Sequence, residues 1–263
     1  KWSEPVNLGP IVNRERKDEH PTVSADGLCL IFQSNRTGAG DLYESRRQGL
    51  DEPFGPPQPL RALNTGAYEM KPWLSADGLL LLFDSSAPRD MPQGGADLFQ
   101  ARRARRDAPW QTPTNLGAGI NSAGPDHFGR LSPDGLTLYF SSDRKDQGQG
   151  GHDLWMAHRS SPTGPWDDPT NLGPSINTRQ NEECCQPIDD DGSLLFTRGA
   201  STGYKLFLAE PASAGAHTVR PVDSPVDKSS FWLLANGQTL IFAALREGGR
   251  GDLDLWESRR IPK

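Results

Sequence analysis

Acidic, basic and imidazole side chains recur in this sequence shortly before each of five glycine-containing turns. Eight residues before the Asp or Asn of each turn stand four carboxylates and one lysine: Asp18, Glu69, Asp126, Glu183 and Lys228. Two carboxylates ~6 Å apart repel each other by about 3 kcal/mol at an effective dielectric of ~20. If these groups converge, a metal ion, a basic side chain or a shared proton must accompany them.

Other chemically capable residues near these acids differ from repeat to repeat, which favours a ligand site over a uniform structural ring. They are His20, Lys71, Trp73, His127, Arg130, Gln186 and Trp232. Aromatic rings beside carboxylates and amides suit a sugar or a peptide side chain. His20 and His127, with Asp126 and Glu183, also suggest a divalent-metal site, because imidazole and carboxylate are its usual ligands.

The repeated acids have a structural interpretation as well. Asp and Asn side chains often accept hydrogen bonds from nearby backbone N–H groups in turns, and a repeat reuses such local devices. On this interpretation each acid caps the start of its own repeat. The sequence leaves capping and ligand binding open.

Three cysteines are too few for a disulfide scaffold. Cys29 lies in an apolar strand pattern and is expected to be a buried thiol. The adjacent Cys184 and Cys185 would either form a strained vicinal disulfide in an oxidising compartment or pack as two reduced thiols. Glu182 and Glu183 beside them make a nucleophilic cysteine unfavourable.

The turns that anchor these residues belong to a five-fold repeat of about 50 residues. Asp-Gly or Asn-Gly between apolar runs is a strong hairpin signal. The repeat is anchored at 24–27, 75–78 and 132–135, with looser copies at 189–192 and 234–237. Each copy reads as four short strands, and such a series predicts the blades of a β-propeller.

The two ends of the chain complement each other. The fifth repeat stops after its third strand, near Arg259, and the missing fourth segment, Trp-x-x-Pro-x-Asn-Leu-Gly, stands at residues 2–9. We therefore expect the N-terminal strand to complete the last blade and close the ring, which removes exposed sheet edges.

The predicted fold is a single all-β domain, residues 1–263, built as a five-bladed β-propeller of four-stranded antiparallel blades. The blades are expected at about 18–61, 69–117, 126–173, 183–222, and 228–260 together with 2–9.

The motifs Trp-x-x-Pro-x-Asn-Leu-Gly, Pro-x-x-Ser-x-Asp-Gly and Gly-x-Asp-Leu-Trp resemble the PD40 (WD40-like) repeats of TolB-type propellers along essentially the whole chain. The resemblance implies a periplasmic or extracellular protein and a binding role toward an envelope protein, peptide or glycan. A more distant TolB-like relative is a metal-dependent pectin lyase.

Composition narrows the function further. A net charge of -6 and a pI of about 5.4 disfavour nucleic acid as a partner. No apolar run is long enough to span a bilayer, and a monomer is expected. The favoured function is a binding module acting through the mouth of the central channel.

The alternatives are a purely structural domain and a carbohydrate-active enzyme. A glycoside hydrolase would use a pair of the repeated acids. A metal-dependent lyase would use His20, His127 and Gln186 as ligands.

Overall fold

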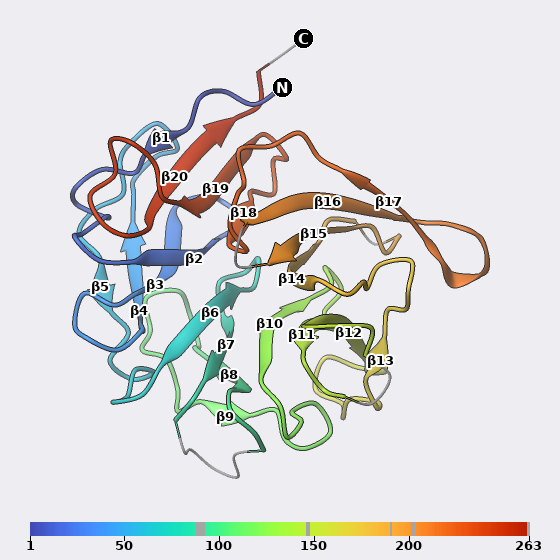
Figure 1. Cartoon of the computed structure of the whole chain (residues 1–263). Coiled ribbons are helices and arrows are strands. Elements are labelled where there is room, and N and C mark those ends of the chain that lie inside the picture. The colour runs from blue at the N-terminus through green and yellow to red at the C-terminus, as the bar shows by residue number, and fades with distance from the viewer. Residues whose placement is uncertain (88–92, 146–147, 190, 201–202, 262–263) are drawn as a thin grey trace.

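The computed structural model describes residues 1–87, 93–145, 148–189, 191–200 and 203–261. Within these ranges the strands form five four-stranded antiparallel sheets around a central axis (Figure 1). The helical content of these ranges is one short 3₁₀ turn, η1 (Ser213–Gly215). The predicted five-bladed β-propeller is confirmed.

The strands of each blade follow one another in the sequence. Blade 1 contains β2 (Asp18–Val23), β3 (Cys29–Ser34), β4 (Asp41–Arg46) and β5 (Gln58–Pro59). Blade 2 contains β6 (Glu69–Leu74), β7 (Leu80–Ser85), β8 (Asp97–Arg102) and β9 (Thr114–Asn115). Blade 3 contains β10 (Asp126–Leu131), β11 (Thr137–Ser142), β12 (Asp153–His158) and β13 (Thr170–Asn171). Blade 4 contains β14 (Asn181–Pro187), β15 (Leu194–Ala200), β16 (Gly203–Pro211) and β17 (His217–Pro221).

Blade 5 joins the two ends of the chain. It contains β18 (Phe231–Leu233), β19 (Thr239–Ala244), β20 (Asp254–Arg259) and, as its fourth strand, β1 (Val6–Asn7). Val6 pairs with Glu257 and Asn7 with Trp256, so the N-terminal strand closes the ring as expected. Figure 1 shows β1 beside β20 in this blade.

One side-chain device fastens the fourth strand in several blades. In blade 2, Asn115 Nδ2 donates to Asp97 Oδ2 at 2.8 Å. In blade 5, Asn7 Nδ2 donates to Asp254 Oδ2 at 2.9 Å. The closing strand is therefore held by the same contact as an internal one, which explains why the Asn-Leu-Gly motif reappears at the N-terminus.

The core lies between the blades. Apolar residues from facing sheets form five clusters, each of which joins neighbouring blades. On the outer side, Arg103 stacks on Trp110 at 4.3 Å and donates to the turn carbonyl of Gly78. Arg47 with Phe54 and Arg159 with Trp166 repeat this arrangement.

The first strands of the blades, β2, β6, β10, β14 and β18, lie nearest the axis (Figure 1) and contact one another around it. Each strand starts at one end of the channel, which we call the start end, and runs to its hairpin turn at the other, the turn end. No helix in the described ranges is long and apolar enough to cross a membrane.

Candidate functional site

A β-bulge in the first strand of blades 1 to 4 controls which side chains enter the channel. The register slips after Glu19, Met70, His127 and Glu183. At each bulge one residue other than glycine adopts the left-handed conformation: His20, Lys71, Phe128 and Cys184, with φ from 50° to 57°. Such backbone costs of order 1–3 kcal/mol per residue, and it persists only where the surroundings hold it.

The repeated acids lie at the start end, but they serve the backbone. Asp18 accepts from Arg14 N, Glu69 from Thr65 N and Asp126 from Ser122 N. Their side chains are fully buried. Asp18 and Asp126 also bind Arg36 and Arg144, at 2.6 and 2.8 Å. The capping interpretation therefore describes these three acids.

In blades 4 and 5, the acid that corresponds to Asp18 is one residue earlier than the sequence analysis predicts. Glu182, not Glu183, accepts from Thr178 N and from Arg198 Nε. In blade 5, Arg246 lies 3.8 Å from Asp227, the residue before Lys228. Burial raises the pKa of Glu182, although its hydrogen bonds from Thr178 and the charge of Arg198 oppose the shift.

The misalignment in blade 4 comes from its hairpin. The pairs Pro187↔Leu194 and Val23↔Leu30 enclose turns of equal length, yet Gly192 stands one position later in its turn than Gly27 does. Counting back from the residue before the glycine therefore gave Glu183. Asp190 of this turn lies outside the described residues.

A different set of polar side chains meets at the start end. His127 Nδ1 lies 2.8 Å from Asp84 Oδ2, and Lys71 Nζ lies 3.4 Å from the same oxygen. Asp84 comes from the second strand of blade 2, is fully buried, and has no partner for Oδ1 among the described residues. Lys71 Nζ also lies 4.9 Å from the centre of the Phe128 ring.

Blades 1, 3 and 4 extend this cluster. His152 Nδ1 lies 2.8 Å from Glu183 Oε1, and the His152 ring meets the His127 ring edge-on at 5.5 Å. In blade 1, His20 Nδ1 lies 2.9 Å from Gln33 Oε1, and Gln33 Nε2 donates to Glu19. We call these groups the polar cluster: Glu19, His20, Gln33, Lys71, Asp84, His127, His152, Glu183 and the neighbouring Tyr204.

The charges in the polar cluster favour ionised carboxylates. Burial alone would raise the pKa of Asp84, but Lys71 and His127 lower it below its usual value. Burial likewise opposes ionisation of Glu183, but the His152 hydrogen bond and the charge of Lys71 lower its pKa. Burial lowers the pKa of His20, which favours its neutral form.

Two buried side chains of blade 3 lie below the polar cluster and contact residues of other blades. Phe128 of blade 3 is buried and meets the His20 ring of blade 1 at 5.3 Å, across the axis. Arg130, also buried, donates to Phe231 O at 3.1 Å and to Cys184 Sγ, and its guanidinium lies 5.1 Å from the Trp232 ring. These two side chains separate the start end from the turn end.

A cavity of about 850 Å³ lies at the turn end, lined by residues of all five blades. Trp73 and Trp232 stand in its wall with Leu74, Leu131 and Ile188. The amide of Gln186, another lining residue, bridges to blade 5, where Nε2 donates to Leu233 O at 2.7 Å and Oε1 accepts from Leu233 N.

The predicted single mouth is therefore two separate regions. His20, Lys71, His127 and Glu183 belong to the polar cluster, whereas Trp73, Gln186 and Trp232 line the turn-end cavity. Lys228 is partly buried and joins neither group. The lyase interpretation required His20, His127 and Gln186 together, but Phe128 and Arg130 stand between the histidines and Gln186.

The cysteines are three buried free thiols. Cys184 packs in the core between blades 4 and 5, whereas Cys185 packs between blades 3 and 4, because neighbouring strand residues point to opposite faces. Burial raises the pKa of both thiols. The structure therefore matches the packed-thiol alternative.

The metal prediction named His20, His127, Asp126 and Glu183. Asp126 is committed to Ser122 and Arg144. In the described part of the chain, no three His, Cys, Asp or Glu side chains are grouped to hold a metal ion.

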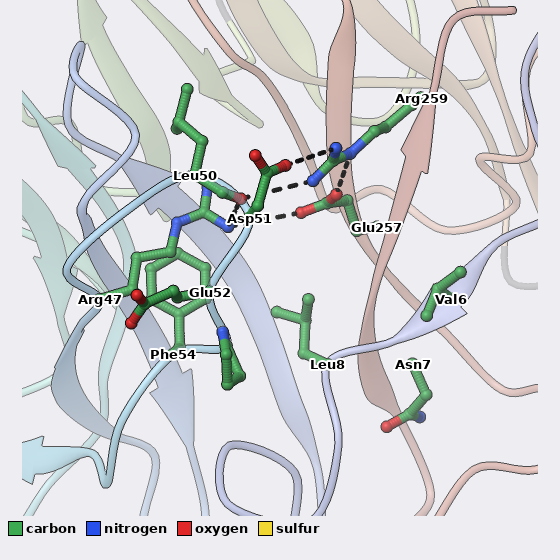
Figure 2. A pocket seen from close by; sticks show the side chains of 11 residues that line it. Val6, Asn7, Leu8, Arg47, Leu50, Asp51, Glu52, Phe54, Glu257 and Arg259 are labelled. Atoms are coloured by element: carbon green, nitrogen blue, oxygen red, sulfur yellow. Dashed lines mark hydrogen bonds and ion pairs between the residues drawn. The ribbon is translucent and has the colours of Figure 1, made fainter.

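A smaller pocket of about 380 Å³ lies outside the channel, at the seam where blade 5 meets blade 1 (Figure 2). Arg259 reaches from β20 to Asp51 at 3.3 Å, while Arg47 lies 3.9 Å from Glu257. Figure 2 shows these ion pairs above Leu8 and Phe54. The pocket follows from ring closure, and four of its charged residues, Arg47, Asp51, Glu257 and Arg259, are already paired.

Sequence reasoning missed Asp84, His152, Gln33 and Tyr204. Asp84 carried a signal, because a carboxylate inside the apolar run Leu80–Ser85 is unusual for a buried strand. His152 directly precedes the Asp-Leu-Trp motif, where blades 1 and 2 have small residues. A bulky polar side chain at that position in one repeat is a difference between the blades that the sequence shows.

No protein-family model and no curated protein sequence matches the chain. Solved structures share the fold. The catalytic domain of a Coprinopsis cinerea GH62 alpha-L-arabinofuranosidase is 13% identical, with a TM-score of 0.65 and coverage of 98% of this chain and 96% of that one. An endo-arabinase from Bacteroides thetaiotaomicron is 13% identical, with a TM-score of 0.61 and coverage of 100% and 98%.

TolB from Acinetobacter baumannii is 17% identical, with a TM-score of 0.52 and coverage of 93% of this chain. This chain spans 54% of that TolB chain, about half its length. The chain is therefore similar in structure both to TolB and to an arabinofuranosidase and an endo-arabinase, and at these identities the likeness concerns the fold alone.

Proposed function

We propose that this chain is an exported interaction module of the PD40 type, whose turn-end cavity receives an apolar or aromatic side chain of a protein or peptide partner. The cavity of about 850 Å³ beside Trp73 and Trp232 carries the proposal. Ligand sites are typically concave, largely apolar and of this size. Aromatic anchors seated in such pockets supply most of the binding energy at protein interfaces.

A polar residue at the rim of the cavity can orient a bound partner, in addition to the apolar contacts inside. Arg102 is exposed at the rim and has no side-chain hydrogen bond among the described residues. Asp77 and Asp134, by contrast, are occupied by their own turns, where each accepts a hydroxyl and a backbone N–H. Arg102 can therefore meet an acceptor on the partner, while the tryptophans contact its apolar part.

Hydrolysis of a glycoside is less well supported than binding. Glycosidases need one carboxyl group with a raised pKa to protonate the leaving group, beside a second, ionised one. In the polar cluster, the pKa values of both Asp84 and Glu183 are lowered. The carboxyl with a raised pKa, Glu182, is buried against Thr178 and Arg198.

The test is selection of a displayed peptide library on the native protein, followed by titration of the selected peptides. We expect enrichment of peptides with aromatic or large aliphatic side chains, and at least about a tenfold loss of affinity in Trp73→Ala. Trp166→Phe, a change of an outer tryptophan, is the matched control and should leave binding unchanged. Selected peptides that bind Trp73→Ala as tightly as wild type would place the partner elsewhere and refute the proposal.

A further inference from the structure

The polar cluster, which the proposed function does not use, holds three imidazoles whose Nδ1 atoms each face an oxygen of a neighbouring side chain. The Nδ1 atoms of His127 and His152 face ionised carboxylates, so they must be the protonated donors. Gln33 donates to Glu19 through Nε2, so its oxygen accepts from His20 Nδ1. This leaves the Nε2 atom of each ring to face a ligand, as an acceptor when the imidazole is neutral.

These three Nε2 atoms are available to a ligand. None has a hydrogen-bond partner within the described residues, and none is among their buried unsatisfied atoms. The side chains of His127 and His152 remain 12% and 24% exposed, and Lys71 remains 13% exposed. The cluster thus presents atoms to solvent instead of sealing them in.

The cluster has more acceptors than donors. Besides the imidazoles, Asp84 Oδ1 is a buried acceptor that lacks a donor in the described chain. Three carboxylates, those of Glu19, Asp84 and Glu183, stand near the single ammonium of Lys71. The excess of negative charge disfavours an anion, and the many acceptors call for a neutral ligand with several O–H donors, acting directly or through water.

An aromatic ring stands beside this acceptor set. Tyr68 is 53% exposed in the loop just before β6. Gly40 connects it to the cluster, since a Cβ on Gly40 would lie 3.2 Å from the Tyr68 ring and 2.8 Å from Gln33 Nε2. Because Phe128 and Arg130 lie below the cluster, a ligand would approach it from the start end, where Tyr68 provides an aromatic ring.

We propose that the polar cluster is a second binding site, for a neutral carbohydrate. Sugar hydroxyls donate to the histidine Nε2 atoms and to the free carboxylate oxygens, Lys71 donates to a ring or hydroxyl oxygen, and the apolar face of the sugar packs on Tyr68. This site is separate from the turn-end cavity, so each site is testable without the other.

Isothermal titration of the whole protein with xylotriose and with cellotriose tests the proposal, with inorganic phosphate and Zn²⁺ as the alternative probes. We expect millimolar or tighter binding of at least one trisaccharide. His152→Gln and Tyr68→Ala should each weaken it by roughly tenfold, because each removes a direct contact. His158→Gln, a change of an exposed histidine on an outer strand, is the matched control and should bind as wild type does.

Two further results decide between the sites. Trp73→Ala should retain trisaccharide binding, and His152→Gln should retain binding of the selected peptides. Failure of both trisaccharides to bind, or binding that survives both His152→Gln and Tyr68→Ala, would overturn the proposal. Binding of Zn²⁺ or phosphate without either sugar would overturn it in favour of an ion site.

Discussion

Replacing Asp126 by Asn should reduce stability while leaving ligand binding intact, although the sequence alone places this residue beside the ligand candidate His127. Asp126 Oδ2 accepts from Ser122 N at 2.6 Å and from the Ser122 hydroxyl at 2.9 Å, while Oδ1 accepts from Arg144 at 2.8 Å. An Asn can accept through one oxygen only, so its NH₂ group would face a donor at the other position.

The expected cost follows from these contacts. Removing one partner of a buried ion pair costs 3–5 kcal/mol. Arg144 would keep its bonds to Ile120 O and Ser142 Oγ, its contact with the Trp155 ring and its 15% exposure. We therefore expect the lower value, about 3 kcal/mol. At about 2–4 °C per kcal/mol for a chain somewhat smaller than this one, Tm should fall by about 6–12 °C.

Thermal unfolding followed by circular dichroism, with urea unfolding at 25 °C, measures this difference. The control is His127→Gln, whose amide can still donate to Asp84 and which should cost about 1 kcal/mol or less. A Tm for Asp126→Asn within 2 °C of wild type would refute the capping assignment. Loss of ligand binding at unchanged stability would show that Asp126 takes part in the binding site.

Two further predictions concern buried groups. Since the pKa of Asp84 is lowered in the folded protein, its charge stabilises the fold at neutral pH, and this contribution should be lost as pH falls below about 4. Acid unfolding, monitored by fluorescence, should therefore be less steep in Asp84→Asn than in wild type. An unchanged unfolding profile would contradict the assignment. Burial raises the pKa of Cys29 to about 12, and all three thiols are buried. A thiol reagent at pH 8 should therefore label no cysteine in the native protein and three in denaturant. Rapid labelling of the native protein would contradict the packing.

The fold was predictable because its signals are local and repeated. Each Ser-x-Asp-Gly turn fixes a hairpin in its own repeat, as when Asp77 Oδ1 accepts from the Ser75 hydroxyl and from Leu79 N. The closing strand was predictable because Asn7, like Asn115, follows a Pro by two residues and is followed by Leu-Gly. Strand order then follows because the fifth repeat has no fourth strand of its own after β20, and five copies leave little choice of architecture.

The site was less predictable, because it depends on geometry that residue spacing does not encode. A bulge places two residues of one strand against one of the next, so side chains beyond it change direction. Counting along the sequence placed Lys71 and Trp73 in one mouth, whereas the bulge in β6 assigns Lys71 to the polar cluster and Trp73 to the turn-end cavity. In blade 4 the later position of Gly192 in its turn led the sequence analysis to Glu183, whereas Glu182 is the capping acid.

Variation between the repeats nonetheless separates the two kinds of residue. Residues that are the same in several blades, such as Asp18 and Asp126, form hydrogen bonds with nearby residues of the chain. Other positions of the first strands differ between blades. One such register holds Thr22, Trp73, Arg130, Gln186 and Trp232, paired in turn with Ile31, Leu82, Tyr139, Leu195 and Ile241. This divergence supports the proposal that a ligand binds at the turn end, where Trp73, Gln186 and Trp232 line the cavity.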